Sequence, residues 1–451
     1  MEREQENDYT DRLSSLPDSL LCHILSFLPT KTSVSTISLV SHRYLHLWKN
    51  LQVFDFYNDY CPGVDGESEH FKHFALFVNA VLALRHSRHI RKMHLSCGDS
   101  ILEDFNLISV NTWVDAAAGS HLEELHLALF SSQGLGFYLP ISILSCTNLL
   151  SLSLCGQIFL ELEQSSTIHL PSLKTLQLDI SYVNANSVDI LLSGCPILET
   201  LDLSFSPESL AKLHVPSSLK SLKVIVENDI GACLEIDAPG LKYLTLTKIT
   251  FGDVAAIGNL HNVEEACLDV FSTPENEYVD PLLTLLQALS GIKHLVLCCS
   301  TAKKRLLGAQ SIINFSNIRF PEFCHLLHLE LILPAFDPFL YNVLQKCPML
   351  QTFIIQNDQD KSPHEYGLAV NLESVPKCLV SCLTFIHFKG YVGYWEEQEF
   401  IKYVLQNGLV LKTMLISGVL LDQMMKWEKY RFLKRFSDLP KGSAVCKVKF
   451  D

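Results

Sequence analysis

Residues 173–178 read LKTLQL, residues 198–203 read LETLDL, and residues 219–224 read LKSLKV. Each stretch follows the pattern L-x-x-L-x-L, and the alternation that ends this pattern is typical of a short β-strand whose leucines face inward. The same pattern, with Ile, Val, Met or Phe accepted in place of Leu, recurs at residues 90–95, 122–127, 149–154, 241–246, 263–268, 292–297, 326–331, 350–355, 383–388 and 411–416. Successive copies start about 21 to 34 residues apart, which indicates a repeat with irregular insertions.

A single copy cannot bury its own leucines, whereas stacked copies bury them in one continuous core. The sequence therefore predicts an α/β fold, a leucine-rich-repeat solenoid with a parallel sheet on its concave face. Pro196, Pro216, Pro239 and Pro348 each stand shortly before a copy, where proline ends the preceding element and favours extended backbone. Chance matches in a leucine-rich core are the alternative, which the number of copies and their shared prolines disfavour.

The N-terminal part has a helical period instead. Residues 11–51, DRLSSLPDSLLCHILSFLPTKTSVSTISLVSHRYLHLWKNL, place Leu16, Leu20, Ile24 and Leu28 at intervals of four residues. The stretch is expected to form three short helices. A unit of about 40 residues is marginal as an autonomous core, so this much apolar surface implies a partner protein.

Local signals predict where these helices begin and end. Pro17 suits the first turn of the first helix, Asp18 complements its positive N-terminus, and Pro29 ends it. A second helix is expected over residues 34–40. Ser41 can cap a third helix after it.

The spacing of these residues closely resembles an F-box, the motif that docks on the Skp-type adaptor of cullin ubiquitin ligases. The residues that the resemblance implies to be adaptor-binding are Leu16, Pro17, Asp18, Leu20, Ile24, Leu25, Leu28, Pro29, Leu39, Val40, Ser41 and Trp48. One position departs from the family, which has Arg-Trp after the Val-Ser step where this chain has Arg43-Tyr44. Tyrosine keeps the aromatic bulk, so the interface is expected to persist.

The C-terminal part is richer in aromatic and charged residues. A helix is expected between Glu396 and Leu405, before the Asn407-Gly408 signal, and another with a basic outer face from Met424 to Phe436. This segment resembles the FBD module found at the C-terminus of many plant F-box proteins. The matching residues are Val375-Pro376-Lys377-Cys378-Leu379, Phe388-Lys389-Gly390-Tyr391, Lys402-Tyr403-Val404-Leu405, Leu411-Lys412-Thr413-Met414, and the ending from Leu439-Pro440 to Phe450-Asp451.

The order F-box, leucine-rich repeats, FBD resembles that plant family over nearly the whole chain. The expected parts are a disordered tail at 1–10, the F-box at 11–51, a linker or N-terminal cap at 52–87, the solenoid at 88–374, and an FBD-like segment at 375–451. The last part is expected to cap the final repeat, as solenoids require for solubility.

Composition narrows the possible functions. With 451 residues, 48% of them hydrophobic, and a net charge of −14, the chain favours a large core and disfavours nucleic-acid binding. The 15 cysteines are scattered and the N-terminus MEREQEND shows no secretory signal, so reduced thiols in the cytoplasm or nucleus are expected. Residues 141–160 approach the hydropathy of a membrane span, but Asn148 and Gln157 interrupt them, so no membrane contact is expected.

The sequence contains no motif for catalysis. No phosphate-binding loop, Rossmann fingerprint, nucleophile elbow or kinase motif set is present. Two pairs are spaced for adjacent helical turns, Cys378 with Cys382 and His42 with His46, but neither pair has further ligands. Neither a metal nor a cofactor is therefore expected. The chain is expected to be non-catalytic.

The resemblance implies a substrate-recognition subunit of a Skp–cullin–F-box ubiquitin ligase, which binds the adaptor, reaches the cullin through it, and holds an unknown protein substrate. In each repeat the residues beside the second and third leucines face the concave side. The candidate substrate-facing residues are Ser151, Ser153, Thr175, Gln177, Thr200, Asp202, Tyr243, Thr245, Glu265, Asp269 and His294. The loops or the C-terminal segment are the alternative location, and a non-degradative interaction scaffold is the alternative function.

Overall fold

The computed structural model divides the chain into two compact units, Met1–Leu198 and Glu199–Asp451, and each is described by itself. The residues it describes are 13, 15–40, 42–58, 67–97, 104–130, 136–163, 168–180, 185–206, 211–227, 232–250, 258, 260–271, 280–298, 320–333, 339–357, 374–418, 427, 430–431, 434, 436 and 438–450.

The first unit begins with a small helical module. Its elements are α1 (Asp18–Leu25), η1 (Thr32–Thr36), η2 (Ile37–Leu39), α2 (Tyr44–Leu47) and η3 (Trp48–Asn50). Pro17 is the residue before α1 rather than part of its first turn. The expected second helix is instead a π-helical turn followed by a 3₁₀ turn, and the β-branched run of Thr32 to Ile37 accounts for this weak helix.

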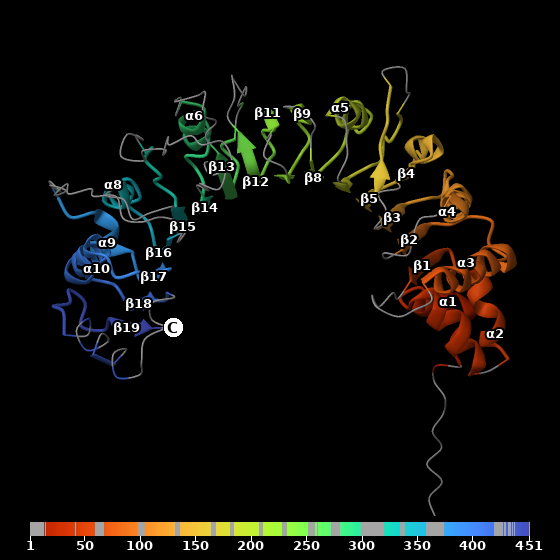
Figure 1. Ribbon diagram of the computed structural model, residues 1–451, viewed down its shortest axis with the longest axis horizontal. Helices are drawn as coiled ribbons and strands as arrows, with labels where there is room; N and C mark the ends of the chain where they lie inside the picture. The colour runs from red at the N-terminus through yellow and green to blue at the C-terminus, as the bar shows by residue number, and fades with distance from the viewer. Residues whose placement is uncertain are drawn as a thin grey trace, which may run out of the picture. The chain divides into compact units, whose positions relative to one another are not determined.

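A parallel sheet follows the module in the first unit. Its neighbouring strands are, in order, β1 (Val53–Asn58), β2 (Lys92–Cys97), β3 (Glu124–Leu129), β5 (Ser151–Gly156) and β7 (Thr175–Ile180). Helices α3 (Glu67–Leu84), α4 (Asp104–Ala117), α5 (Ala185–Ser193) and the 3₁₀ turn η4 (Ile141–Ser145) connect the strands, and β4 (Phe137–Tyr138) pairs with β6 (Ile158–Phe159). The helices lie together on one side of the row of strands (Figure 1).

The second unit repeats this architecture. Its sheet orders β8 (Thr200–Phe205), β10 (Ser221–Val226), β12 (Tyr243–Thr250), β13 (Glu265–Phe271), β14 (His294–Cys298), β15 (His328–Leu333), β16 (Thr352–Asn357), β17 (Phe385–Lys389), β18 (Thr413–Ile416) and β19 (Lys447–Phe450), every neighbour parallel. The connecting helices are α6 (Asp280–Ala288), α8 (Phe339–Lys346), α9 (Lys377–Ser381) and α10 (Trp395–Asn407), and β9 (Ala211–Val215) pairs with β11 (Ala232–Ile236).

The repeat pattern explains both sheets. Every predicted copy of L-x-x-L-x-L becomes a strand that starts at its third residue, as LKTLQL does at Thr175 and LETLDL at Thr200. The leucines of the pattern are buried, and the residues between them lie on the opposite, partly exposed face of the sheet. The predicted α/β leucine-rich-repeat fold with a parallel sheet is confirmed.

Besides the short paired strands β4, β6, β9 and β11, the strands β1 and β19 lie outside the predicted copies. Residues 52–87, expected to be a linker or cap, contain β1, which pairs with β2 and makes the sheet begin directly after the helical module. At the other end, β19 extends the sheet beyond the last predicted copy. Residues 141–160 form η4, β5 and β6, and among the described residues no helix is long and apolar enough to span a bilayer.

The C-terminal segment is built into the second sheet through β17, β18 and β19. The helix expected near residues 396–405 is α10, and Gly408 follows its end as predicted. The Glu397 carboxylate, fully buried, accepts hydrogen bonds from the backbone N–H groups of Val392, Gly393 and Tyr394 and so fixes the start of this helix. The helix expected over 424–436 falls mainly on residues outside those described.

Candidate protein-docking site

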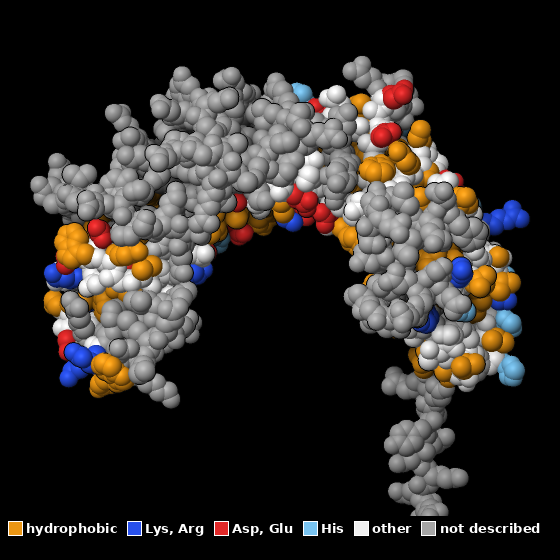
Figure 2. Space-filling model, viewed as in Figure 1, with side chains coloured by type: hydrophobic (Ala, Val, Ile, Leu, Met, Phe, Trp, Pro, Cys, Tyr) orange, Lys and Arg blue, Asp and Glu red, His pale blue; other side chains and the backbone are white. Residues whose placement is uncertain are grey.

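Helix α1 has one buried edge and one exposed edge. Leu21 and Leu25 are buried in the module, whereas Leu20, Ile24 and Phe27 are 49%, 41% and 75% exposed. Figure 2 shows hydrophobic side chains on the surface where Figure 1 places α1 and α2. An exposed row of large apolar side chains is costly to leave in water, so it marks a contact surface.

Further large apolar side chains of the same module are exposed. They are Leu39, Val40 and Leu45, with Leu39 at 85% exposure. Together with Leu20, Ile24 and Phe27 they define the exposed apolar set of the module. The size of this set agrees with the expectation that the module cannot hide its apolar residues within itself.

The structure places the predicted adaptor-binding residues in three different environments. Pro17, Asp18, Leu20, Ile24, Pro29, Leu39 and Val40 are exposed, Leu16 and Leu28 are half-buried, and Ser41 lies outside the described residues. Leu25 and Trp48, 4% and 7% exposed, are buried in the interior of the module. Phe27 and Leu45 are exposed apolar residues that the prediction did not include, although Phe27 follows Ile24 at the i, i+3 spacing of one helix face.

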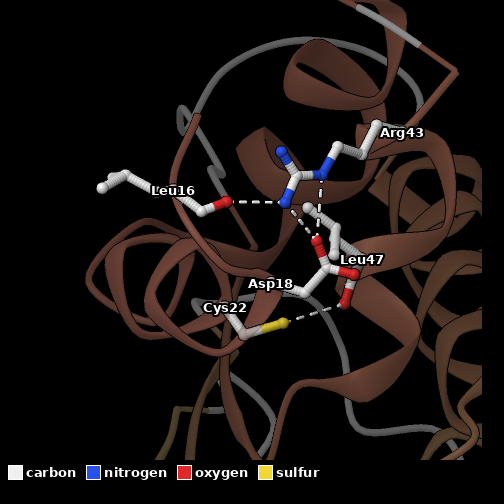
Figure 3. Close-up of polar contacts among 5 residues, drawn as sticks. All are labelled: Leu16, Asp18, Cys22, Arg43 and Leu47. Atoms are coloured by element: carbon white, nitrogen blue, oxygen red, sulfur yellow. Dashed lines mark hydrogen bonds and ion pairs between the residues drawn. The ribbon is translucent and has the colours of Figure 1, made fainter. Parts of the chain in front are cut away.

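A polar contact joins the two ends of the module. The Arg43 guanidinium donates from Nε at 2.9 Å and from Nη2 at 2.5 Å to Oδ1 of Asp18, and Nη2 also donates at 2.6 Å to the carbonyl oxygen of Leu16 (Figure 3). The contact fixes the residues on either side of Pro17 against α2. Sequence reasoning did not select Arg43, because an ion pair between positions far apart leaves no periodic signal.

Hydrogen bonds to backbone carbonyls hold the interior of the module. Ser33 Oγ donates at 3.2 Å to Leu25 O, and the Cys22 thiol donates at 3.6 Å to Leu47 O (Figure 3). Burial, and to a lesser degree the nearby Asp18 carboxylate, raises the pKa of the Cys22 thiol, which therefore acts as a neutral donor. These bonds order the non-helical turns between α1 and α2.

Tyr44, where the family has tryptophan, lies inside the module. Its side chain is buried, and its hydroxyl oxygen finds no hydrogen-bond partner among the described residues. Because the ring does not reach the surface, the departure from the family pattern changes the packing of the module and leaves the exposed apolar set as it is.

The module is attached to the first repeat. The backbone N–H of Asp55 in β1 donates at 2.8 Å to Thr30 Oγ1, and the N–H of His86 donates at 2.8 Å to the carbonyl oxygen of Lys49. Leu51, buried, continues the chain directly into β1. The module therefore covers the N-terminal end of the sheet in addition to presenting its exposed apolar set.

The predicted substrate-facing residues of the first unit lie on the face of its sheet opposite the buried leucines, which we call the outward face. Ser151 and Thr175 are neighbours in register, as are Ser153 and Gln177, and Ser153 Oγ donates at 3.1 Å to Gln177 Oε1. Ser153 is nonetheless buried beneath its neighbours. Because these side chains bond to each other across the strands, the surface at Ser153 and Gln177 is polar.

The predicted substrate-facing residues of the second unit are also outward. They are Thr200, Asp202, Tyr243, Thr245, Glu265, Asp269 and His294. Three of them form cross-strand contacts: Asp202 with Lys223 at 3.0 Å, and Glu265 with Nδ1 of His294 at 3.2 Å. The prediction did not include the residues between the leucines of β15 to β18, whose repeat copies carry the same signal.

Chemistry at buried thiols is disfavoured. Burial raises the pKa of the Cys97 and Cys195 thiols to about 12, so they remain protonated at neutral pH. Within the described parts of the chain, no group of three His, Cys, Asp or Glu side chains is arranged to hold a metal ion.

Comparison with known proteins agrees with the three parts seen here. Residues 13–56 match the F-box domain, residues 371–416 match FBD, and residues 110–266 match the LRR repeats of FBD-associated F-box protein At5g56370. F-box/FBD/LRR-repeat protein At4g26340 of Arabidopsis thaliana is 32% identical, over 98% of this chain and 100% of its own length. FBD-associated F-box protein At5g60610 of Arabidopsis thaliana is 30% identical, over 90% of this chain and 100% of its own length.

Proposed function

The chain belongs to the F-box/FBD/LRR-repeat family of plant proteins, and from this premise we propose that it is the substrate-recognition subunit of a Skp–cullin–F-box ubiquitin ligase. The F-box implies binding to a Skp-type adaptor, and the repeats provide a protein-interaction surface. The observation that carries the proposal is the exposed apolar set around α1, which the described residues of the chain leave exposed.

The proposed mechanism is proximity. The module binds the adaptor and, through it, the cullin, while the sheet face or the C-terminal segment holds a protein substrate. Holding both in one assembly raises the effective concentration of substrate lysines near the activated ubiquitin, without any chemistry by this chain. We place this activity in the cytoplasm or nucleus, on the expectation from the sequence that the cysteines stay reduced.

A reconstituted ligase tests the proposal. Purified full-length chain is combined with adaptor, cullin, RING subunit, ubiquitin-conjugating and activating enzymes, and ubiquitin transfer to the chain itself is followed on gels. Transfer is expected with the wild-type chain and lost when Leu20, Ile24 and Phe27 are all changed to serine. Leu76→Ser, at an exposed leucine of α3 outside the module, is the matched control and should retain transfer.

A non-degradative scaffold is the competing function, and the same assay separates the two. A scaffold would bind the adaptor through the exposed apolar set yet support no ubiquitin transfer. Tyr44 departs from the family pattern, but because it is buried it does not alter the surface that the adaptor would meet. Ubiquitin transfer that persisted without adaptor or cullin would reject both functions.

A further inference from the structure

The outward face of the second sheet changes character along its length. In β8, β10 and β12 the first two outward positions of each strand carry Thr, Asp, Ser, Lys or Tyr side chains. From β14 to β18 the outward positions include the partly exposed side chains Val296, Ile332, Ile354, Phe385 and Leu415, which we call the apolar strip. An open sheet face is normally polar, so this strip requires an explanation.

The register shows that apolar and polar side chains alternate along the apolar strip. One row across the strands contains Val296, Glu330, Ile354, His387 and Leu415 in neighbouring positions. Ile332 and Phe385 lie one outward position away from this row, on either side of Ile354. Ile354 is therefore the centre of the strip.

An ion pair crosses the strip. Lys389 Nζ in β17 lies 2.7 Å from Glu330 Oε1 in β15, so the pair reaches over β16 beside Ile354. The two side chains are only 33% and 19% exposed. Because each charge is paired with the other, the pair adds no net charge to the strip beside Ile354.

The two ends of the strip differ in charge. Beside β14, Glu265 in β13 contacts His294, and its side chain is half exposed. Beyond β18, Lys447 and Lys449 in β19 are exposed and form no ion pair within the described part of the chain. The strip therefore runs from an acidic end to a basic end.

We propose that β13 to β19 bind an extended segment of the protein substrate whose central side chains are aliphatic or aromatic. A basic side chain of this segment lies at Glu265 and an acidic side chain at Lys447 and Lys449, because only that direction matches the two charged ends. Six strand spacings separate β13 from β19, about 29 Å, which an extended segment of about nine residues covers. Calling the ligand a substrate rests on the proposed function, whereas the binding preference does not.

Selection from a displayed library of random nonapeptides tests the preference. The full-length wild-type chain is the bait, and peptides that also bind the Ile354→Asp variant are removed. The enriched peptides are expected to have an apolar centre, Lys or Arg at one end and Asp or Glu at the other. Enrichment of no peptides, or of peptides without this charge asymmetry, would overturn the proposal.

Point variants test the location. The Kd of an enriched peptide, measured by fluorescence anisotropy, is expected to rise at least tenfold with Ile354→Ser. Ile225→Ser is the matched control, because Ile225 is an outward isoleucine of β10 outside the strip, and it should leave the Kd unchanged. Equal effects of both variants, with melting temperatures equal to that of the wild type, would contradict the location.

Charge reversal tests the direction. The double variant Lys447→Glu/Lys449→Glu is expected to weaken the enriched peptide at least tenfold and to recover affinity when the acidic end of the peptide is changed to lysine. A loss without recovery would overturn the charge pairing. Adaptor binding is measured on the wild type and on each variant in parallel. A wild-type chain that does not bind the adaptor would reject the proposed function, and the peptide preference would then be judged by its own measurements.

Discussion

The guanidinium of Arg43 and the carboxylate of Asp18 meet at 2.5 Å, although 24 residues separate them in the sequence. Because Arg43 also donates to the Leu16 carbonyl, one side chain fixes the segment that leads into α1. The exposed apolar set begins directly after this segment, so the contact determines how Leu20 and Ile24 are presented. We infer that the pair positions the exposed apolar set.

Arg43→Ala is therefore expected to reduce adaptor affinity more than it reduces stability. The pair is partly exposed, so its loss should lower the free energy of unfolding by at most about 1 kcal/mol. Adaptor affinity, measured by calorimetry, should fall by about three- to tenfold, because the start of α1 is no longer fixed. Arg43→Lys keeps the charge but not the paired donors, and is expected to recover only part of this loss. An adaptor affinity unchanged in Arg43→Ala would contradict the positioning role.

Leu25 and Leu20 should respond to substitution in opposite ways. Leu25→Ala removes a buried side chain and is expected to cost about 2–5 kcal/mol of unfolding free energy, measured by denaturant titration. Leu20→Ser removes an exposed side chain and should change stability by less than about 0.5 kcal/mol, while weakening adaptor binding. If both variants proved equally destabilising, the assignment of the two edges of α1 would be wrong.

Tyr44→Phe is expected to be tolerated. The hydroxyl is buried and has no partner among the described residues, so removing it should leave the free energy of unfolding unchanged or raise it by up to about 1 kcal/mol. Tyr44→Ala, which also removes the ring, should instead cost about 3–5 kcal/mol. Both free energies of unfolding are to be measured by chemical denaturation followed by circular dichroism. A large decrease in the free energy of unfolding of Tyr44→Phe would reveal a hydrogen bond to the hydroxyl.

Leu201 and Asp202 test the phase of the repeats. Leu201 is buried within the second unit, so Leu201→Asp places an unpaired charge in the core and is expected to cost several kcal/mol, on the order of 3–5. Asp202 lies on the outward face and pairs with Lys223, so Asp202→Leu should change stability by no more than about 1 kcal/mol. The reverse order of melting temperatures would show that the strand faces are exchanged.

The sequence predicted most of the sheet, because a repeated pattern reports the same geometry many times. The leucine positions of each copy assign its inward face, and stacking neighbours then leaves little freedom in register. The strand β1 was missed although residues 51–56, LQVFDF, fit the same pattern with Phe54 and Phe56 in place of leucines. The strand β19 was missed although residues 445–450, VCKVKF, also fit the pattern with Val and Phe in place of leucines.

The docking surface was predicted less completely. Helical spacing shows that α1 is apolar on more than one edge, but it does not say which edge packs against the same chain. Leu25 and Trp48 were therefore selected together with residues that are exposed, while Phe27 and Arg43 were not selected at all. Only the folded arrangement of the turns between α1 and α2 separates these groups.

Adaptor binding by the exposed apolar set is the central claim, and point variants test it better than deleting residues 11–51. Deletion would also remove the Thr30 and Lys49 hydrogen bonds to the first repeat. The decisive measurement is the Kd of the purified full-length chain for a purified Skp-type adaptor, by isothermal titration calorimetry. The combined change of Leu20, Ile24 and Phe27 to serine is expected to raise this Kd at least a hundredfold, with the melting temperature and the Leu76→Ser control unchanged. A wild-type chain that does not bind the adaptor, or a triple variant that binds as tightly as the wild type, would contradict the account.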